Sequence, residues 1–301
     1  MSKNILITGA TGLIGKHLIP ELQKQGHHIS ILARKNTALK NVKVYLWDIE
    51  QQTIDPAAFE GIDTVIHLAG EGIADKRWTA ERKKEIVDSR IKSAHLLYKT
   101  IHETKAKVST FISASAVGYY GNRGDEFLWE DSEPGKGFLA KCCVLWEKAA
   151  DEGLNLGIRV VKIRLGIILS GDGGALPAMA KPIKLFVGAP LGSGKQWVPW
   201  IHIHDVVGIF AQAVTDQKMH GAYHATAPYP SSNKVLTHRI AYWLSRPVWP
   251  INVPRAILKM VMGESSTMVL MSSNTSAKKT VDAGYEFQYT DLDKALKEIY
   301  R

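Results

Sequence analysis

Residues 7–18, ITGATGLIGKHL, decide the fold of this chain. Glycines recur there with the spacing G-x-x-G-x-x-G, directly after the apolar run at 4–8 and at the start of a helical pattern. In such a loop the first glycine permits a tight turn, the second admits a pyrophosphate, and the third lets the helix pack on the strand. The free N–H groups of the helix N-terminus attract phosphate. We therefore predict a dinucleotide site built from Gly9, Thr11, Gly12, Leu13, Ile14 and Gly15.

The first half of the chain alternates strand and helix patterns. Apolar, β-branched runs predict strands at 28–34, 42–47, 64–70, 110–117 and 159–169, and helical periodicity predicts helices at 12–26, 80–104 and 138–153. Alternation of this kind is typical of parallel βαβ units. The expected fold is α/β, a Rossmann-like doubly wound parallel sheet with a small α-rich C-terminal lobe.

The second half of the chain predicts the division into domains. The Rossmann domain should cover 1–170, together with a helix at 205–216, for which Asp205 is the expected N-cap, and a strand at 221–226. Residues 171–204 and 227–301 should form the substrate and C-terminal lobe, because they contain a Gly- and Pro-rich stretch followed by short helical patterns.

The end of the second expected strand indicates which dinucleotide is bound. Arg34 and Lys35 stand about 19 residues after Gly15, where NAD-preferring proteins carry an acidic residue. An acidic side chain would repel a ribose 2′-phosphate, whereas arginine binds it through charge-assisted hydrogen bonds. The sequence therefore favours NADP as the cofactor, with NAD as the alternative.

Composition excludes several classes of function. The net charge of +9 is spread among interleaved acids and bases, so we expect no nucleic-acid partner. No apolar run is long enough to span a membrane and the N-terminus lacks a signal-peptide pattern, so we expect a cytoplasmic protein with a small-molecule substrate.

The only cysteines are the adjacent Cys142 and Cys143, which rules out a disulfide framework. The motif HIHD at 202–205 shows no third ligand, so no metal is expected. The chain could be a monomer or a homodimer.

Several further motifs carry a family resemblance that spans the whole chain. The sequence resembles the extended short-chain dehydrogenase/reductase superfamily, and most closely its atypical "epimerase family" branch, which has a small C-terminal domain. The motifs are TGATGLIG, HLAGEGI, RWTAERKKEIVDSR, ISASAVGYYG, FLAKCCVLWE, GGAL, PWIHIHDVV and the tail at 263–299.

The resemblance implies roles for residues outside the glycine loop. Leu68, Ala69, Gly70 and Glu71 would line the adenosine side of the cleft, Asp48 would lie near the adenine, and Glu85 and Arg90 would flank the cofactor on the long helix. Ser113, Ala114 and Ser115 would face the nicotinamide, and Ser115 would be the serine of the superfamily's Ser–Tyr–Lys triad. The backbone at Arg164 and Ile167 would contact the nicotinamide end.

The expected Tyr–Lys pair of that triad is missing. Aligned on Glu147, the tyrosine position is Leu139 and the lysine position is Cys143; a shift by one residue gives Phe138 and Cys142. Tyr119, or its neighbour Tyr120, could supply the acid instead, and packing is the alternative role of both. Two functions therefore stay open: an NADP-dependent oxidoreductase or epimerase-like enzyme, or a sensor that binds the cofactor without turnover.

Overall fold

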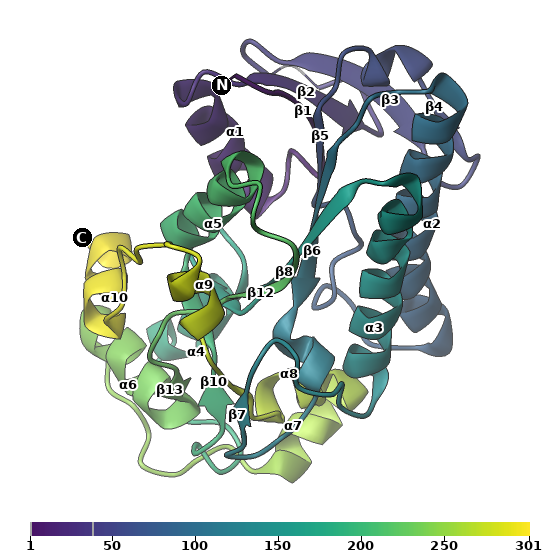
Figure 1. The fold of residues 1–301 in the computed structure, drawn as a ribbon. Helices are drawn as coiled ribbons and strands as arrows, with labels where there is room; N and C mark the ends of the chain where they lie inside the picture. Colours follow the sequence, from purple (N-terminus) through teal and green to yellow (C-terminus); the bar gives the residue numbers. More distant parts are fainter. Residues whose placement is uncertain (1, 38) are drawn as a thin grey trace.

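The main sheet carries the glycine loop between its first strand and its first helix. The structure, a computed structural model, describes residues 2–37 and 39–301. Its largest sheet has eight strands in the order β12-β8-β6-β5-β1-β2-β3-β4, and all neighbours are parallel except β4 against β3 (Figure 1). The strands are β1 (Asn4–Thr8), β2 (His28–Ala33), β3 (Lys43–Asp48), β4 (Thr53–Ile54), β5 (Thr64–His67), β6 (Thr110–Ala116), β8 (Arg159–Leu165) and β12 (Gly221–Ala225).

Chain order reverses across β1. From β1 the chain proceeds through β2 to β3 on one side, and then returns to β5, β6, β8 and β12 on the other. A doubly wound sheet binds its ligand outside the carboxyl ends of the strands at this switch point. The predicted Rossmann-like fold is confirmed, and the switch point lies between β1 and β5.

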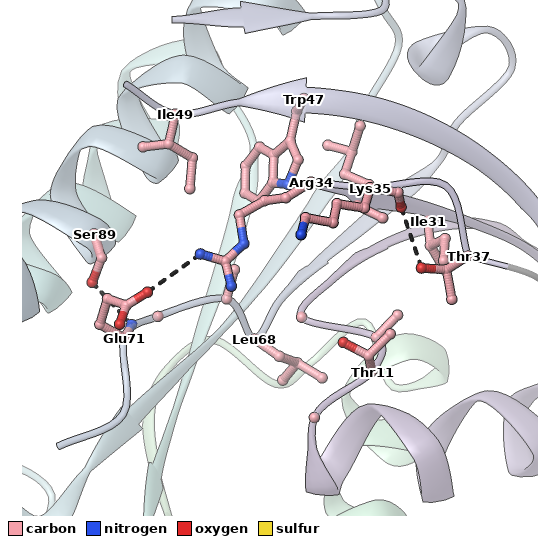
Figure 2. Close-up of a pocket in the computed structure, with 17 residues that line it drawn as sticks. Thr11, Ile31, Arg34, Lys35, Thr37, Trp47, Ile49, Leu68, Glu71 and Ser89 are labelled. Atoms are coloured by element: carbon pink, nitrogen blue, oxygen red, sulfur yellow. Dashed lines mark hydrogen bonds and ion pairs between the residues drawn. The ribbon is translucent and has the colours of Figure 1, made fainter. Parts of the chain in front are cut away.

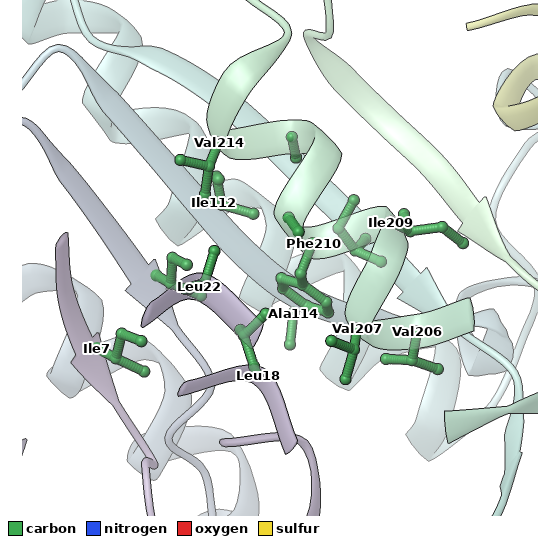
Figure 3. Close-up of a cluster of buried hydrophobic side chains, with 14 of the residues drawn as sticks. Ile7, Leu18, Leu22, Ile112, Ala114, Val206, Val207, Ile209, Phe210 and Val214 are labelled. Carbon is green, nitrogen blue, oxygen red and sulfur yellow. The ribbon is translucent and has the colours of Figure 1, made fainter. Parts of the chain in front are cut away.

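Helices cover both faces of this sheet. Helices α1 (Leu13–Lys24) and α5 (Ile203–Thr215) pack together on one face, and α2 (Ala80–Thr104) and α3 (Phe138–Asp151) on the other (Figure 1). Figure 3 shows Leu18 and Leu22 of α1 facing Phe210 of α5 above Ile112 of β6. Because both faces are covered, the central strands β1, β5 and β6 are buried along nearly their whole length, as is usual in parallel sheets.

The strand expected at 159–169 is divided in two. β8 ends at Leu165, and β9 (Ile167–Leu169) leaves the main sheet to pair with β11 (Trp200–His202). Gly166 makes the break, because a Cβ on it would lie 2.3 Å from the carbonyl oxygen of Pro199. The sequence predicted one strand because the apolar run is continuous. Hydrophobicity does not indicate that a strand leaves one sheet and pairs in another.

The expected N-cap of α5 is also corrected. The cap is His202, whose Nδ1 accepts a hydrogen bond from the His204 backbone N–H at 3.2 Å. Asp205 lies inside the first turn and is fully buried. Its carboxylate accepts hydrogen bonds from the Tyr285 hydroxyl and from the backbone N–H groups of Gln288 and Tyr289, so it anchors the C-terminal segment instead.

The C-terminal lobe has its own apolar core of Leu176, Trp200, Leu236, Ile240 and Leu296. Its helices are α4 (Ala175–Lys184), α6 (Asn233–Trp243), α7 (Arg255–Met262), α8 (Thr267–Leu270), α9 (Lys278–Asp282) and α10 (Leu292–Tyr300). Two-residue strands tie it together, among them β14 (Asn274–Thr275), which pairs with β7 (Phe127–Leu128). Across residues 2–37 and 39–301, no helix is both long and apolar enough to cross a membrane.

Candidate functional site

A cavity of about 680 Å³ opens at the carboxyl ends of β1, β2 and β5 (Figure 2). It lies at the switch point of the sheet, where the topology predicts ligand binding. The cavity is lined by the glycine loop, the end of β2, the end of β3 and the segment after β5. The lining residues are Gly9, Ala10, Thr11, Gly12, Ile31, Leu32, Ala33, Arg34, Lys35, Thr37, Trp47, Ile49, Leu68, Ala69, Gly70, Glu71 and Ser89.

The geometry of the loop explains each of its glycines. Gly9 has φ +68°, and a Cβ there would lie 2.7 Å from the carbonyl carbon of Leu68. A Cβ on Gly15 would lie 2.5 Å from the Ala10 carbonyl oxygen, so this glycine permits the helix to pack on the loop. Gly12 is the N-cap of α1 and has ordinary extended backbone angles. The space around its Cβ position is open apart from the Gly9 oxygen at 3.2 Å, and Gly12 faces the cavity.

A buried histidine supports the wall opposite the loop. The Thr8 hydroxyl accepts hydrogen bonds from the backbone N–H groups of Leu68 and Ala69, and it donates to His67 Nδ1 at 2.7 Å. His67 Nε2 in turn donates to the Ser93 hydroxyl at 3.0 Å, because that hydroxyl donates to backbone oxygen. Burial, and then the nearby Arg90 charge, lower the pKa of His67 to about 4. The ring is therefore neutral at physiological pH.

Two cations stand at the rim of the cavity at the end of β2. Figure 2 shows Arg34 and Lys35 extending from β2 toward the cavity. Arg34 is 75% exposed, and its guanidinium lies 3.4 Å from the Glu71 carboxylate. An exposed pair of this kind contributes little stability. Arg34 is therefore free to turn toward an anionic ligand.

Glu71 is shared with a second arginine. The Arg82 guanidinium is buried and donates to Glu71, to Glu85 at 2.8 Å and to the Gly72 carbonyl. Glu85 therefore holds Arg82 in place rather than lining the cavity. This network fixes the loop that follows β5.

The end of the cavity next to β3 contains aromatic and aliphatic surface. Trp47 and Ile49 line it, whereas Asp48 between them accepts hydrogen bonds from the backbone N–H groups of Glu50 and Gln51. Ser89 also lines the cavity and accepts a hydrogen bond from the Glu71 N–H. Sequence reasoning missed eight of the lining residues, among them Trp47, Ile49 and Ser89. Their positions in the sequence could have indicated these three. Trp47 and Ile49 flank the predicted residue Asp48, and Ser89 lies within the motif RWTAERKKEIVDSR.

Arg90 lies behind the same segment. Its guanidinium donates to the carbonyls of Ile86 and Glu71 and lies over the Trp146 ring, 4.7 Å from the centroid. A Cβ on Gly70 would lie 3.1 Å from the Arg90 Cζ. Desolvation lowers the pKa of Arg90, and the neighbouring thiols of Cys142 and Cys143 act in the opposite direction. Arg90 therefore braces the cavity wall from behind.

Strands β6 and β8 and helix α3 share a buried ion-pair network. The Ser115 hydroxyl donates to Glu147 Oε1 at 2.6 Å, and Arg164 binds both oxygens of the same carboxylate at 2.8 and 2.9 Å. All three side chains are buried. Arg164 lies within β8, paired in register with Ser115 of β6. The Ser115 hydroxyl is hydrogen-bonded to Glu147 of α3. Its catalytic role therefore stays a prediction.

The two tyrosines after β6 differ in their surroundings. Tyr120 is fully buried; its hydroxyl accepts from Arg164 and lies within hydrogen-bonding distance of both the Trp129 carbonyl and His224 Nε2. Tyr119 is half-buried, and the Arg164 guanidinium lies over its ring, 3.7 Å from the centroid. Burial raises the pKa of both phenols. Tyr120 is a structural residue, and Tyr119 is the more accessible of the two.

Two residues of α3, Leu139 and Cys143, at which the sequence analysis looked for a Tyr–Lys pair, lie opposite the end of β6. A Cβ on Gly118, in the short 3₁₀ helix η2 (Val117–Tyr120), would lie 3.5 Å from Leu139 Cβ and 3.6 Å from Cys143 Sγ. Leu139 and Cys143 are thus the residues of α3 that face this turn. Both cysteines are free and buried, and burial raises the pKa of each thiol. Neither is a ready nucleophile.

Glu298, near the C-terminus, lies beside the two histidines of the HIHD motif. His202, His204 and Glu298 bring one ligand-type atom each within 4.8 Å of one another. His202 Nδ1 accepts the cap hydrogen bond, so the ring carries its proton on Nε2 and donates it to Glu298 at 2.9 Å. A nitrogen that bears a proton cannot bind a metal. The geometry therefore favours a hydrogen-bonded pair over a metal site.

The structure brings only part of the predicted set together. Nine predicted residues line the cavity: Gly9, Thr11, Gly12, Arg34, Lys35, Leu68, Ala69, Gly70 and Glu71. Twelve others do not line it: Leu13, Ile14, Gly15, Asp48, Glu85, Arg90, Ser113, Ala114, Ser115, Tyr119, Arg164 and Ile167. The second group belongs to α1, braces the cavity wall or lies toward β6 and β8, outside the cavity.

Comparison with known protein families agrees with this arrangement. Residues 5–225 match the model of the NAD dependent epimerase/dehydratase family, and residues 253–299 match a domain of unknown function, DUF1731. The second match covers α7 to most of α10 in the C-terminal lobe.

Individual relatives align along nearly the whole chain. The epimerase family protein YfhF of Bacillus subtilis is 36% identical, with 98% of this chain and 97% of the relative covered. The chloroplastic SDR39U1 homolog of Arabidopsis thaliana is 35% identical, with 98% and 86% covered.

Solved structures extend the comparison. The crystal structure of human epimerase family protein SDR39U1 (isoform 2) with NADPH superposes with a TM-score of 0.87 at 30% identity, covering 99% of both chains. UDP-glucose 4-epimerase of Thermus thermophilus, at 16% identity and a TM-score of 0.78 over 99% and 97% of the chains, shares the fold. The glycine loop, the doubly wound sheet and the matched C-terminal lobe together show that this chain belongs to the NAD dependent epimerase/dehydratase family, in its "epimerase family protein" branch.

Proposed function

We propose that this protein is an NADP(H)-dependent oxidoreductase or epimerase-like enzyme acting on a small molecule. The observation that carries the proposal is the pair Arg34 and Lys35 at the rim of a cavity whose floor is a glycine loop. Bound there, NADP(H) would supply hydride chemistry.

The cavity walls assign the parts of the cofactor. Gly9 and Gly12, with the N-terminus of α1, would hold the pyrophosphate. Trp47 and Ile49 would flank the adenine, and Arg34 would exchange its loose contact with Glu71 for the ribose 2′-phosphate. The human relative, whose structure contains NADPH, supports this assignment.

Cofactor binding is tested by calorimetric titration of the full chain with NADPH and with NADH. Arg34 and Lys35 should make NADPH bind at least about tenfold more tightly, since a charge-assisted hydrogen bond contributes roughly 1.5–3 kcal/mol. The selectivity should shrink as salt is raised, because the cations are exposed. Equal affinities would contradict the assignment of the 2′-phosphate site.

A second function is favoured by one specific observation. The family resemblance implies that the proton-transfer pair would stand at Leu139 and Cys143, or one residue earlier at Phe138 and Cys142, and none of these side chains can perform that chemistry at neutral pH. A protein that binds NADPH and reports its redox state without turnover would need no such pair. The two functions separate in one experiment: cofactor-loaded protein is mixed with a panel of acceptors, and NADPH oxidation is followed. Turnover with any acceptor supports the enzyme, and binding without turnover supports the sensor.

A further inference from the structure

The net charge of the chain is concentrated in two segments. Residues 173–204 and 217–263, which we call the basic segments, contain nine lysines and arginines but no aspartate or glutamate. Their charge of +9 equals the net charge of the whole chain, so acids and bases balance in the remaining residues. The interleaving of acids and bases, as in RWTAERKKEIVDSR, is therefore a property of those remaining residues. The basic segments contain α4, α6 and α7, so most of the excess charge lies in the C-terminal lobe.

The basic segments also hold most of the exposed apolar surface. Among the described residues, eleven of the seventeen large apolar side chains that are exposed lie in these two segments. Single exposed apolar side chains are common on any protein surface, whereas a continuous patch of them marks an interaction site. The arrangement of the eleven side chains therefore decides whether they form such a site.

Two parts of the basic segments lie side by side and form a patch, which we call the lobe tip. The Trp249 backbone N–H donates to the Gly188 carbonyl at 2.9 Å, and its indole Nε1–H donates to the Phe186 carbonyl at 2.8 Å. The apolar side chains of the lobe tip are between 55% and 74% exposed, and they are Leu185, Phe186, Val187, Trp249 and Ile251. The patch is therefore continuous across both parts of the chain.

Cations stand directly beside the lobe tip. Lys181 and Lys184 lie in the last turn of α4, and Leu185 follows them in the chain. The Arg246 guanidinium lies over the Phe186 ring, 4.8 Å from its centroid. All three cationic side chains are exposed, and the basic segments contain no acidic residue to neutralise them. The lobe tip therefore combines apolar surface with positive charge.

Helix α7 continues this surface. The Gly192 N–H donates to the Val253 carbonyl at 2.9 Å, which places the start of α7 beside the segment that follows the lobe tip. Ile257, Met260 and Val261 recur at the spacing i, i+3, i+4, so they share one face of the helix, and all three are exposed. Figure 1 shows α7 and the loop before it along the lower edge of the lobe.

The single sign of the charge distinguishes between the partners that such a surface could bind. A second copy in a twofold dimer would bring the same positive surface against itself, and like charges repel. Nucleic acid is bound through its phosphates by cations, which would leave the aliphatic side chains of the lobe tip exposed. An anionic lipid bilayer suits both features, because its headgroups attract cations and its interfacial layer accepts aromatic and aliphatic side chains.

We propose that the lobe tip and the exposed face of α7 dock on the surface of a bilayer that contains anionic lipids. The cations beside the lobe tip would contact the lipid headgroups, and Phe186, Trp249 and Ile251 would enter the interfacial layer. The chain would lie on the membrane without spanning it. This inference is independent of the proposed function, because none of these residues lines the cofactor cavity.

The test is flotation of the full chain with lipid vesicles in a density gradient. One set of vesicles contains equal parts of phosphatidylserine and phosphatidylcholine, and the comparison set contains phosphatidylcholine alone. The chain should bind the mixed vesicles at least about tenfold more tightly, since each cation near an anionic surface contributes about fivefold. Binding should weaken as the salt concentration is raised, because the cations are exposed.

A matched pair of acidic substitutions locates the docking surface. Ile251→Glu, at a side chain that is 74% exposed, should weaken binding to the mixed vesicles by about tenfold or more, because it places a negative charge in the lobe tip. Leu154 is 58% exposed and lies in the short 3₁₀ helix η3 (Glu152–Leu156), outside the basic segments. Leu154→Glu changes the net charge equally and should keep the affinity within about twofold, because charges far from the contact are screened.

A second matched pair tests the cations. Lys184→Gln combined with Arg246→Gln should weaken binding by about tenfold or more and make it less dependent on salt. Lys84→Gln combined with Lys99→Gln removes the same charge from exposed positions on α2 and should keep the affinity within about twofold. Calorimetry should show wild-type melting temperatures for all these variants, because the substituted side chains are exposed.

Four results would overturn the inference. The first is no binding to the mixed vesicles, or equal binding to both kinds of vesicle. The second is an equal loss in Ile251→Glu and Leu154→Glu, which would reduce the effect to net charge. The third is binding to heparin without binding to vesicles, which would assign the basic segments to an acidic polymer. The fourth is a dimer in solution that Ile251→Glu dissociates, which would assign the lobe tip to a second copy of the chain.

Discussion

Replacing Gly12 by valine should abolish NADPH binding and leave the fold intact. Gly12 has φ −75° and ψ 175°, angles that valine adopts without strain. The nearest atom to its Cβ position is the Gly9 oxygen at 3.2 Å, and the rest of the side chain would enter the cavity. There it would occupy the place of the pyrophosphate. Overpacking of about 3 kcal/mol would weaken binding by a factor of roughly 100 or more.

Gly15→Ala is the matched control on the same loop. Its Cβ would lie 2.5, 2.6 and 2.7 Å from the backbone oxygen, Cα and carbonyl carbon of Ala10. Those backbone atoms cannot rotate away, so we expect the strain to lower the free energy of unfolding by about 1–3 kcal/mol. The higher helix propensity of alanine offsets up to about 1 kcal/mol of this loss. We expect a melting temperature lower by about 2–6 °C.

Differential scanning calorimetry and isothermal titration separate the two effects. Gly12→Val should melt within about 2 °C of the wild type and show no NADPH heat, because its clash is with the ligand alone. Gly15→Ala should melt lower. Wild-type NADPH affinity in a folded Gly12→Val protein would refute the placement of the pyrophosphate, and an undiminished melting temperature in Gly15→Ala would refute the packing argument.

Four further outcomes are expected. Arg34→Asp should weaken NADPH by about 1.5–3 kcal/mol and spare or improve NADH, measured by calorimetry; an equal loss for both would contradict it. Cys142→Ser and Cys143→Ser should leave any activity nearly unchanged, since both thiols are buried with raised pKa; lost turnover in a folded variant would make them chemical. Glu147→Gln should destabilise the protein by about 3–5 kcal/mol in chemical denaturation, because it leaves a buried guanidinium unpaired; a cost below about 1 kcal/mol would refute this. Burial holds the pKa of His67 at about 4 against 6.5 when exposed, so its contribution to stability should be full above pH 6.5 and lost as the pH falls toward 4; a His67→Gln variant with an equally steep acid loss would exclude this histidine as the cause.

Local sequence patterns predicted the elements of the fold well. The helix expected at 80–104 is α2 with the same bounds, because Thr79 caps it and its apolar residues recur at helical spacing. The glycine loop and the Arg34–Lys35 pair were also located, since both depend on backbone geometry and charge within a few residues. These features are encoded locally.

The features that sequence did not predict depend on partners far along the chain. Ser115 was expected to face the nicotinamide, but its hydrogen-bond partner Glu147 stands 32 residues later. Asp205 resembled a cap, but its partners lie 80 to 84 residues away in the C-terminal segment. Glu298 reaches His202 across 96 residues. No periodicity reports such contacts, because they join segments that meet only in the folded chain.

The most direct test of the central claim is a titration of the wild-type protein with NADPH, NADP⁺, NADH and NAD⁺ under one set of conditions. The account predicts a single site for the phosphorylated cofactors, with at least about tenfold selectivity over the unphosphorylated ones. That selectivity should disappear in Arg34→Asp, and binding of every cofactor should disappear in Gly12→Val. Absent binding, or equal affinity for all four cofactors, would contradict it.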